Sequence, residues 1–215
     1  NRLVGLLGYN IEYGKKYGGA TSVSIGYVGN QGNPFSYTIS GDMNGDRISG
    51  NELMFIPLNG YAIKFQPLVV GTRTYTDLEQ QAALEKFISQ DKYMNAHRGE
   101  YAQRNGTVLP MLHRFDLSVV QDINIMVKSS KNTLQFRADI LNFGNMLNNK
   151  WGVSRRVTNP SVLAYQTTTN NEPIYKLATQ TLPDGVVLIK DTFSRNSSVF
   201  DVWTAQLGIR YIFGN

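Results

Sequence analysis

Apolar and polar side chains alternate with a period of two along five segments of the chain. These segments cover residues 3–13, 22–27, 114–125, 134–140 and 203–213. In the fourth segment, Phe136 and Ile140 fall on one face, and Arg137 and Asp139 fall on the other. Because successive side chains of a strand point to opposite sides, the alternation predicts five strands, each with one apolar and one polar face.

Two all-β architectures would use such strands. Segments of about 10 residues match the length that crosses a bilayer at a tilt, with apolar side chains toward lipid and charged ones toward water. A soluble β-sandwich binding module would instead bury one face of the last segment in a protein core. The residues on that face are Trp203, Leu207, Ile209, Tyr211 and Phe213. The charged faces and aromatic ends favour the membrane wall, because a sandwich interior does not tolerate unpaired charge.

The connections between the five strands have two lengths. Short turns are predicted at residues 14–19 and 128–132, and long connections cover about residues 30–110 and 146–198. Outer-membrane barrels have short periplasmic turns and long outer loops, and the two kinds alternate here as that rule requires. The chain opens within the strand pattern, so we expect that residue 1 is not the biological start.

The long connections carry local signals of their own. Residues 76–90 predict a helix, because Thr76 and Glu79 have the spacing of a capping box. The face that we expect this helix to bury consists of Leu78, Ala82, Phe87 and Ile88. Residues 183–185, Pro-Asp-Gly, predict the turn of a hairpin.

Composition narrows the function classes. The 21 basic and 16 acidic residues are scattered, so the formal charge of +5 does not predict a nucleic-acid partner. The absence of cysteine excludes disulfides and cysteine-based metal or redox sites. There is no apolar run of about 18 residues that would predict a membrane-spanning helix. His97 and His113 have no partner at ligand spacing, and no catalytic motif is present, so we do not expect an enzyme.

The stretch "DMNGDRISGNE" at residues 42–52 resembles a calcium-binding loop. Asp42, Asn44 and Asp46 place oxygen ligands at loop positions 1, 3 and 5. The remaining register departs from the motif, because Arg47 takes the place of the turn glycine and Glu52 stands one place early. Calcium is therefore the candidate cofactor, and a turn in which Asp and Asn bond their own backbone is the alternative.

Residues 98–122 carry three arginines near the start of the third predicted strand, Arg98, Arg104 and Arg114. One interpretation pairs them with Asp116 and Asp122 across the strand. The other directs them into a lumen, where they would contact an inner plug or an anionic ligand. The sequence alone allows both.

Four strings of the chain resemble stretches of one family, in the family's order. They are "SGDMNGDRISGNELMFIP", "HRGEYAQRNGTVLPMLHRFDLSVVQDI", "LQFRADILNFGNMLNNKWG" and "AQLGIRYIF". They are similar to the D-x-N-G-D-G loop, the R-G…R-N…D-L-x-x-x-Q-D stretch, the F-x-x-D-x-x-N…W-G segment and the closing strand of TonB-dependent outer-membrane transporters. The resemblance is strongest to Oar-like receptors with a carboxypeptidase-regulatory-like N-terminal domain, and weaker to the starch-utilisation (SusC/RagA) importers. Arg47 and the ending Phe213-Gly214-Asn215 depart from the family pattern.

The resemblance implies a fold and a location. The chain would be the C-terminal part, residues 1–215, of an antiparallel transmembrane β-barrel of about 22 strands in the cell outer membrane. Its five strands would belong to the wall, and the plug domain would not be in this chain. The implied function is ligand uptake driven by TonB. The implied partners are the rest of the barrel and its plug, the TonB motor complex through the plug, the lipid bilayer, and a surface lipoprotein or other outer-membrane proteins.

Loops on a rigid scaffold are where ligands usually bind, so the long connections are the candidate contact regions. Their candidate contact residues are Tyr37, Phe55, Tyr61, Tyr165 and Tyr175. The alternative is that these aromatic side chains pack the loops themselves. The alternative function within the membrane is a structural or adhesive barrel that transports nothing.

Overall fold

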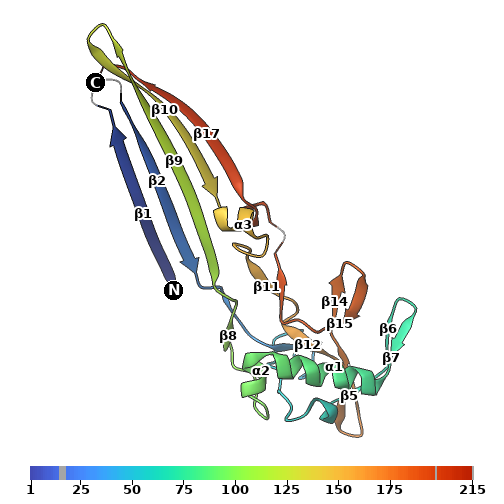
Figure 1. Ribbon diagram of the computed structural model, residues 1–215. Helices are drawn as coiled ribbons and strands as arrows, with labels where there is room; N and C mark the ends of the chain where they lie inside the picture. Colours follow the sequence, from blue (N-terminus) through green and yellow to red (C-terminus); the bar gives the residue numbers. More distant parts are fainter. Residues whose placement is uncertain (15–17, 197, 215) are drawn as a thin grey trace. The chain divides into compact units, whose positions relative to one another are not determined.

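The computed structural model describes residues 1–14, 18–196 and 198–214 and is mostly β, as predicted (Figure 1). The predicted turn at 14–19 includes residues 15–17, which lie outside the described residues. The chain divides into two compact units. Unit 1 comprises residues 1–32, 110–155 and 195–215, and unit 2 comprises residues 33–109 and 156–194. Among the residues described, none of the helices has the length and apolar character of a membrane span.

Unit 1 contains a single five-stranded sheet. Its strands are β1 (Arg2–Tyr13), β2 (Gly19–Asn30), β9 (Leu112–Val127), β10 (Ser130–Leu141) and β17 (Thr204–Ile212). They lie in the order β1-β2-β9-β10-β17, and every neighbouring pair is antiparallel. This confirms the five predicted strands. Within the described residues β1 and β17 each pair on one side only, so the sheet is open.

The strand register gathers most of the large apolar side chains on one face. At one end of this apolar face a single row runs across all five strands through Tyr13, Gly19, Ile123, Leu134 and Tyr211. Toward the other end Tyr27 lies beside Phe115, with ring centroids 5.0 Å apart. Aromatic side chains therefore flank a band of aliphatic ones.

The opposite face is polar, and its side chains bond to one another. These bonds join Gln135 Nε2 to Asp122 Oδ1 (2.8 Å), Thr133 Oγ1 to Asn124 Oδ1 (2.9 Å), Ser22 Oγ to Asn10 Oδ1 (2.7 Å) and Arg137 Nε to Asp139 Oδ2 (2.6 Å). The charged residues of the alternating pattern thus lie together on one side of the sheet, as the period of two predicts.

The buried hydrophobic core lies entirely in unit 2. Every fully buried apolar side chain of the described residues belongs to that unit, including Met54, Leu84 and Val162. In unit 1 the apolar side chains are exposed or only partly buried, with Leu207 85% and Leu7 75% accessible. Unit 1 is therefore a sheet without a core of its own among the described residues.

Unit 2 is built from the two long connections. Four strands, β4 (Thr38–Ser40), β12 (Ser161–Thr169), β13 (Glu172–Leu177) and β5 (Lys64–Phe65), form a mixed sheet in the order β4-β12-β13-β5. The helices are α1 (Asp77–Gln90), α2 (Lys92–Ala96) and the short 3₁₀ helix η1 (Gly60–Ala62). Three further strand pairs of the unit are β3 (Pro34–Phe35) with β8 (Thr107–Val108), β6 (Leu68–Val70) with β7 (Arg73–Tyr75), and β14 (Thr179–Leu182) with β15 (Gly185–Leu188).

The remaining elements are α3 (Phe143–Leu147), β11 (Arg155–Val157), β16 (Phe193–Arg195) and η2 (Val199–Asp201).

Helix α1 begins as predicted, and its buried face includes two of the four predicted residues, Phe87 and Ile88. The capping box of Thr76 and Glu79 is present. The buried residues are Gln80, Leu84, Phe87 and Ile88, whereas Leu78 is 65% exposed and Ala82 is exposed. The reason is polar: Gln80 donates to the carbonyl of Gln66 (2.8 Å) and accepts from the amide of Leu177 (3.0 Å). The buried face therefore includes the Gln80 amide, which can be buried because it is hydrogen-bonded. Hydrophobicity alone does not predict a polar residue at this position.

The hairpin predicted at residues 183–185 is confirmed, because Leu182 pairs with Gly185 at the end of β14 and β15. The hairpin of β12 and β13 was not predicted. Its turn is Asn170-Asn171, and both residues have positive φ, 51° and 61°. Asparagine tolerates this conformation, which tight two-residue hairpins require, so the dipeptide was the available signal.

Of the two interpretations of the three arginines, pairing with Asp116 and Asp122 does not occur among the described residues. Arg98 pairs with Glu85 at 2.8 Å, and Arg114 lies 3.5 Å from Asp201. Asp116 instead accepts a hydrogen bond from the backbone amide of Asn142 (2.7 Å). The Asp116 carboxylate therefore caps the backbone where β10 ends, and it does not pair with an arginine.

Candidate ligand-binding site

An aromatic-lined pocket of about 290 Å³ lies in unit 2. Its aromatic side chains are Phe55, Tyr101 and Tyr175, and Ile39, Leu163 and Pro173 are among the other apolar residues of the lining. A β-bridge joins Phe55 to Tyr101, and their rings meet edge to face with centroids 5.2 Å apart. Ligand pockets usually span about 300–1,000 Å³, so this one fits a single ring or side chain of a larger ligand.

Two of the five predicted contact residues, Phe55 and Tyr175, line this pocket. Tyr165 does not line the pocket, but its ring meets that of Tyr175 edge to face, with the centroids 6.3 Å apart. Tyr61 is 49% exposed on η1 and does not line the pocket. Tyr37 is 1% exposed and packs in the core of unit 2, so its position is that of a packing residue.

The buried hydroxyl of Tyr37 belongs to a hydrogen-bond network around Asp91. Its hydroxyl donates to Asp91 Oδ2 (2.5 Å), and the Thr192 hydroxyl donates to the same oxygen (2.7 Å). The other oxygen, Oδ1, accepts from the amide of Met94 (2.8 Å). Burial and the neighbouring carboxylate raise the pKa of Tyr37 well above its ordinary value. The hydroxyl therefore stays protonated and keeps the buried carboxylate satisfied.

Three polar groups sit at the pocket. Lys64 and Glu172 line it and form an ion pair, and both side chains are more than half exposed. Burial raises the pKa of Tyr175, and Tyr101 and Tyr165 add to the effect, so its hydroxyl is a neutral donor near pH 7. The arrangement offers ring faces for apolar contact with charged groups of both signs beside them. Tyr101, Lys64 and Glu172 were not predicted.

The calcium-like loop adjoins this pocket. Met43, which belongs to the loop, lines the pocket, and its sulfur accepts a hydrogen bond from the Tyr175 hydroxyl (3.5 Å). One carboxylate oxygen each of Asp42, Asp46 and Glu52 lies within 4.8 Å of the others. Glu52 thus joins the predicted ligands Asp42 and Asp46 although it stands one place early in the motif.

The loop also explains the departure at Arg47. This residue has φ 68°, the left-handed conformation that the glycine of the motif normally adopts. Its amide donates to Asp42 Oδ2 (2.8 Å). The amide of Ile48 donates to Asp46 Oδ1 (2.7 Å), and this bond is the main reason that the pKa of Asp46 lies below its ordinary value. The backbone therefore takes the path of the motif despite the substitution.

Hydrogen bonds within the loop also bear on the calcium prediction. The side-chain oxygen of the third predicted ligand, Asn44, accepts from the amide of Asp46 (2.9 Å). Glu52 Oε2 is buried and has no hydrogen-bond partner among the described residues. The oxygen set fits a hard cation such as calcium, and the hydrogen bonds fit a self-capped turn, so calcium stays a prediction.

No protein-family model, curated protein or solved structure matches the chain. The geometry of the two units is therefore the basis for proposing a function.

Proposed function

We propose that the chain forms part of the wall and the outer loops of a TonB-dependent transporter in the outer membrane. Unit 1 is the wall, with its apolar face toward lipid and its polar face toward the lumen and plug. Unit 2 is the outer, ligand-capturing part. The observation that carries the proposal is the exposed apolar face of the five-stranded sheet.

This face is too large and too apolar to be ordinary protein surface. Leu7, Leu207 and Ile209 are 74–85% exposed, and they belong to one continuous face of five strands. Monomeric soluble proteins rarely expose an apolar patch beyond a few hundred Å². A sandwich would need a second sheet over this face, and unit 1 contains none that could cover it among its described residues.

The height of the apolar band supports a membrane. Along β9, Phe115 belongs to the aromatic end and Ile123 to the row that ends in Tyr211. At roughly 3.4 Å per residue these positions are about 27 Å apart along the strand. With a tilt of about 40° the band is about 20 Å tall between ring positions, close to the roughly 25 Å of outer-membrane barrels.

Polar groups on the apolar face are bonded. Thr21 donates to Gln121 Oε1 (2.7 Å), and Gln121 Nε2 in turn bonds to the Tyr13 hydroxyl. This is what a lipid-facing position requires, since an unpaired polar group costs several kcal/mol there. The open edges at β1 and β17 have the same consequence: in lipid they must pair with further strands, so the proposed wall requires more strands than these five.

Labelling of single cysteines tests the proposed wall, because the chain has no cysteine of its own. In the full-length protein in membranes, we expect Gln206→Cys and Arg210→Cys to react with a water-soluble maleimide. Leu207→Cys and Ile209→Cys should react only after the membrane is dissolved. Equal labelling of the two sets in intact membranes would contradict the wall.

Transport is distinguished from adhesion by energy dependence. Cells that express the full-length protein are compared with a strain that lacks a functional TonB complex. If the protein transports, nutrient-dependent growth or accumulation is lost in the second strain while surface binding remains. If growth and accumulation are the same in both strains, the structural or adhesive barrel is the better account.

A further inference from the structure

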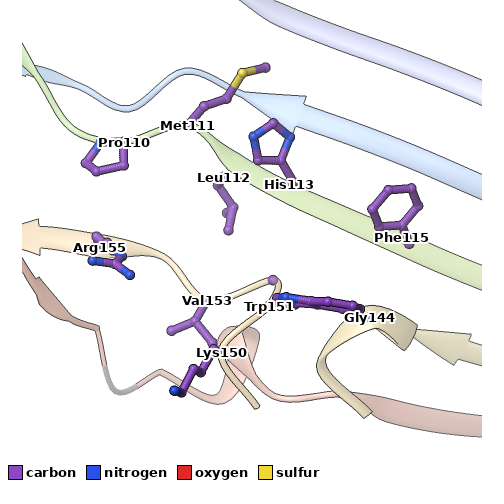
Figure 2. Close-up of a pocket in the computed structure, with 11 residues that line it drawn as sticks. Pro110, Met111, Leu112, His113, Phe115, Gly144, Lys150, Trp151, Val153 and Arg155 are labelled. Carbon is purple, nitrogen blue, oxygen red and sulfur yellow. The ribbon is translucent and has the colours of Figure 1, made fainter. Parts of the chain in front are cut away.

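A second cavity, of about 720 Å³, lies within unit 1 beside the first residues of β9 (Figure 2). Met111, Leu112, Phe115, Trp151 and Val153 provide most of its apolar lining. Figure 2 shows Leu112 and Phe115 on opposite sides of β9, and both side chains line the cavity. At these residues β9 has no strand partner on the β10 side, because the pairing of β9 with β10 ends at Leu117 and Ile140.

Two asparagines fix the wall of the cavity that faces β9. The chain leaves β10 through Asn142, which has φ 53° and is 4% exposed. Its side chain donates to the carbonyl of Gly152 (3.0 Å), and the side chain of Asn145 donates to the carbonyl of Trp151 (2.9 Å). Trp151 is therefore held in place by buried bonds although 56% of its own surface is exposed.

The cavity continues the apolar face of the sheet. Phe115 lines the cavity and lies in register with Tyr27, which belongs to that face. His113 also lines it and bonds to the Tyr27 hydroxyl (2.8 Å). Tyrosine and tryptophan accumulate where a membrane protein passes from hydrocarbon to headgroups, since one end of each ring is apolar and the other polar.

The charge of the lining has one sign. Lys150 and Arg155 line the cavity, and no carboxylate does. In the described part of the chain neither cation takes part in an ion pair. An apolar cavity with two available cations is complementary to a molecule that has a hydrocarbon chain and an anionic head.

We propose that this cavity binds an acyl chain of a phosphorylated membrane lipid, with the lipid phosphate against Lys150 and Arg155. The inference rests on the proposed membrane wall, which places this end of the sheet at the outer surface. The occupant is then the lipid A of the outer leaflet. Trp151 and Phe115 contact the acyl chain, and the two cations contact the headgroup.

Native mass spectrometry of the full-length protein tests the site. The protein is stripped of lipid in a neutral detergent and titrated with diphosphorylated lipid A or with phosphatidylcholine. We expect lipid A to bind more tightly than phosphatidylcholine. Lys150→Gln with Arg155→Gln should weaken lipid A binding about thirtyfold, from the usual contribution of two cations near anionic lipid. The control Lys86→Gln with Lys190→Gln removes the same charge from exposed positions of unit 2 and should stay within about twofold.

Three results would overturn the inference. They are unchanged binding of lipid A by the Lys150 and Arg155 variant, equal binding of phosphatidylcholine, and displacement of the lipid by inorganic phosphate alone at low concentration, which would indicate a site for the free ion. The test can fail separately from the proposed function. If lipid A binding fails but the cysteine labelling follows the strand period, the wall stands without this site. If the labelling fails and the charge variant still loses lipid A, the cavity binds the lipid in solution, and both the wall and the placement of the cavity at the outer surface are excluded.

Discussion

Asn142 and Asn170 share a left-handed backbone conformation but differ in what their side chains do. Asn142 is buried and donates to the carbonyls of Gly152 (3.0 Å) and Asp201 (3.3 Å). Asn170 is exposed at the turn between β12 and β13. Both positions favour asparagine for its backbone, and only the first also uses its amide.

Replacement of the two asparagines by alanine separates these contributions. Both variants incur the strain of left-handed alanine, about 1–2 kcal/mol. Asn142→Ala also leaves two buried carbonyls without a donor, for a total loss of about 2–5 kcal/mol in the free energy of unfolding. Urea unfolding of the full-length protein in micelles measures both variants. Equal losses would show that the buried bonds contribute little.

Asp46 tests the calcium prediction. If the loop binds calcium with the millimolar to submillimolar affinity of extracellular sites, about 10 mM calcium stabilises unit 2 by roughly 1–3 kcal/mol. Its melting temperature should then rise with calcium, and chelator should reverse the rise. Asp46→Asn should remove the response, and the control Asp184→Asn in the β14–β15 turn should retain it. A wild-type melting temperature that ignores calcium would leave the self-capped turn as the role of the loop.

Residue-level roles were only partly predictable. Loop aromatics were expected to bind, yet Tyr37 belongs to the core and Tyr175 to a pocket. Nothing local to a tyrosine tells these positions apart, because the difference depends on Asp91 and Thr192, which lie far away in sequence. Glu52 shows the opposite. The motif register did not predict it as a ligand, but the backbone path of the loop brings it into the cluster with Asp42 and Asp46.

At the scale of elements, β17 offers a matched pair on its two faces. Leu207 belongs to the apolar face and Gln206 to the polar face. In the proposed wall, Leu207→Arg places a charge near the middle of the bilayer and should cost about 2–4 kcal/mol, whereas Gln206→Arg should be nearly neutral. Urea titration of the full-length protein folded into lipid vesicles measures both. Similar costs for the two variants would argue against lipid on the Leu207 side.

Helix α1 predicts a pH dependence for unit 2. Arg98 donates to both oxygens of Glu85 (2.8 and 3.1 Å), and the amide of Gly60 donates to one of them (2.8 Å). The hydrogen bonds from Arg98 are the main reason that the pKa of Glu85 lies below its ordinary value of about 4.3. A lowered pKa in the folded state gives stability that is complete above the ordinary value and is lost as the pH falls through the folded value.

Calorimetry between pH 3 and 7 checks this dependence. The melting transition of unit 2 should weaken below about pH 4.5. Glu85→Gln should lower stability at pH 7 by about 1–3 kcal/mol and flatten the acid limb. The control Glu100→Gln changes an exposed carboxylate and should leave the curve unchanged. An acid limb that persists in Glu85→Gln would assign the effect to other groups.

Elements with a strict period were predicted well, and those without one were missed. The five strands of unit 1 alternate over about six to twelve residues each, and all five appear in sequence order in the sheet. In contrast, β4 and β5 contain three and two residues and pair in parallel with β12 and β13. These pairs are short and join segments about 110–120 residues apart. They leave no local pattern in the sequence, so the long connections were predicted as loops.

For the whole molecule, the proposed wall fixes which turns lie on which side of the membrane. The β9–β10 turn, Lys128-Ser129, belongs to the short periplasmic set, and the β14–β15 turn, with Asp184 at its tip, belongs to the outer part. Both turns are exposed, so access alone does not distinguish them. On intact cells, a membrane-impermeant maleimide should therefore label Asp184→Cys in the full-length protein. Ser129→Cys should be labelled only after the outer membrane is opened.

This orientation decides whether the two units can serve uptake together. If the wall is oriented as proposed, the pocket of Phe55, Tyr101 and Tyr175 belongs to the outer part, on the side from which a ligand arrives. Force from a TonB motor is applied from the periplasmic side, where the short turns would lie. The reverse labelling, with Ser129→Cys reactive on intact cells and Asp184→Cys protected, would place the pocket on the motor side. Capture from outside would then be excluded even if the sheet does face lipid.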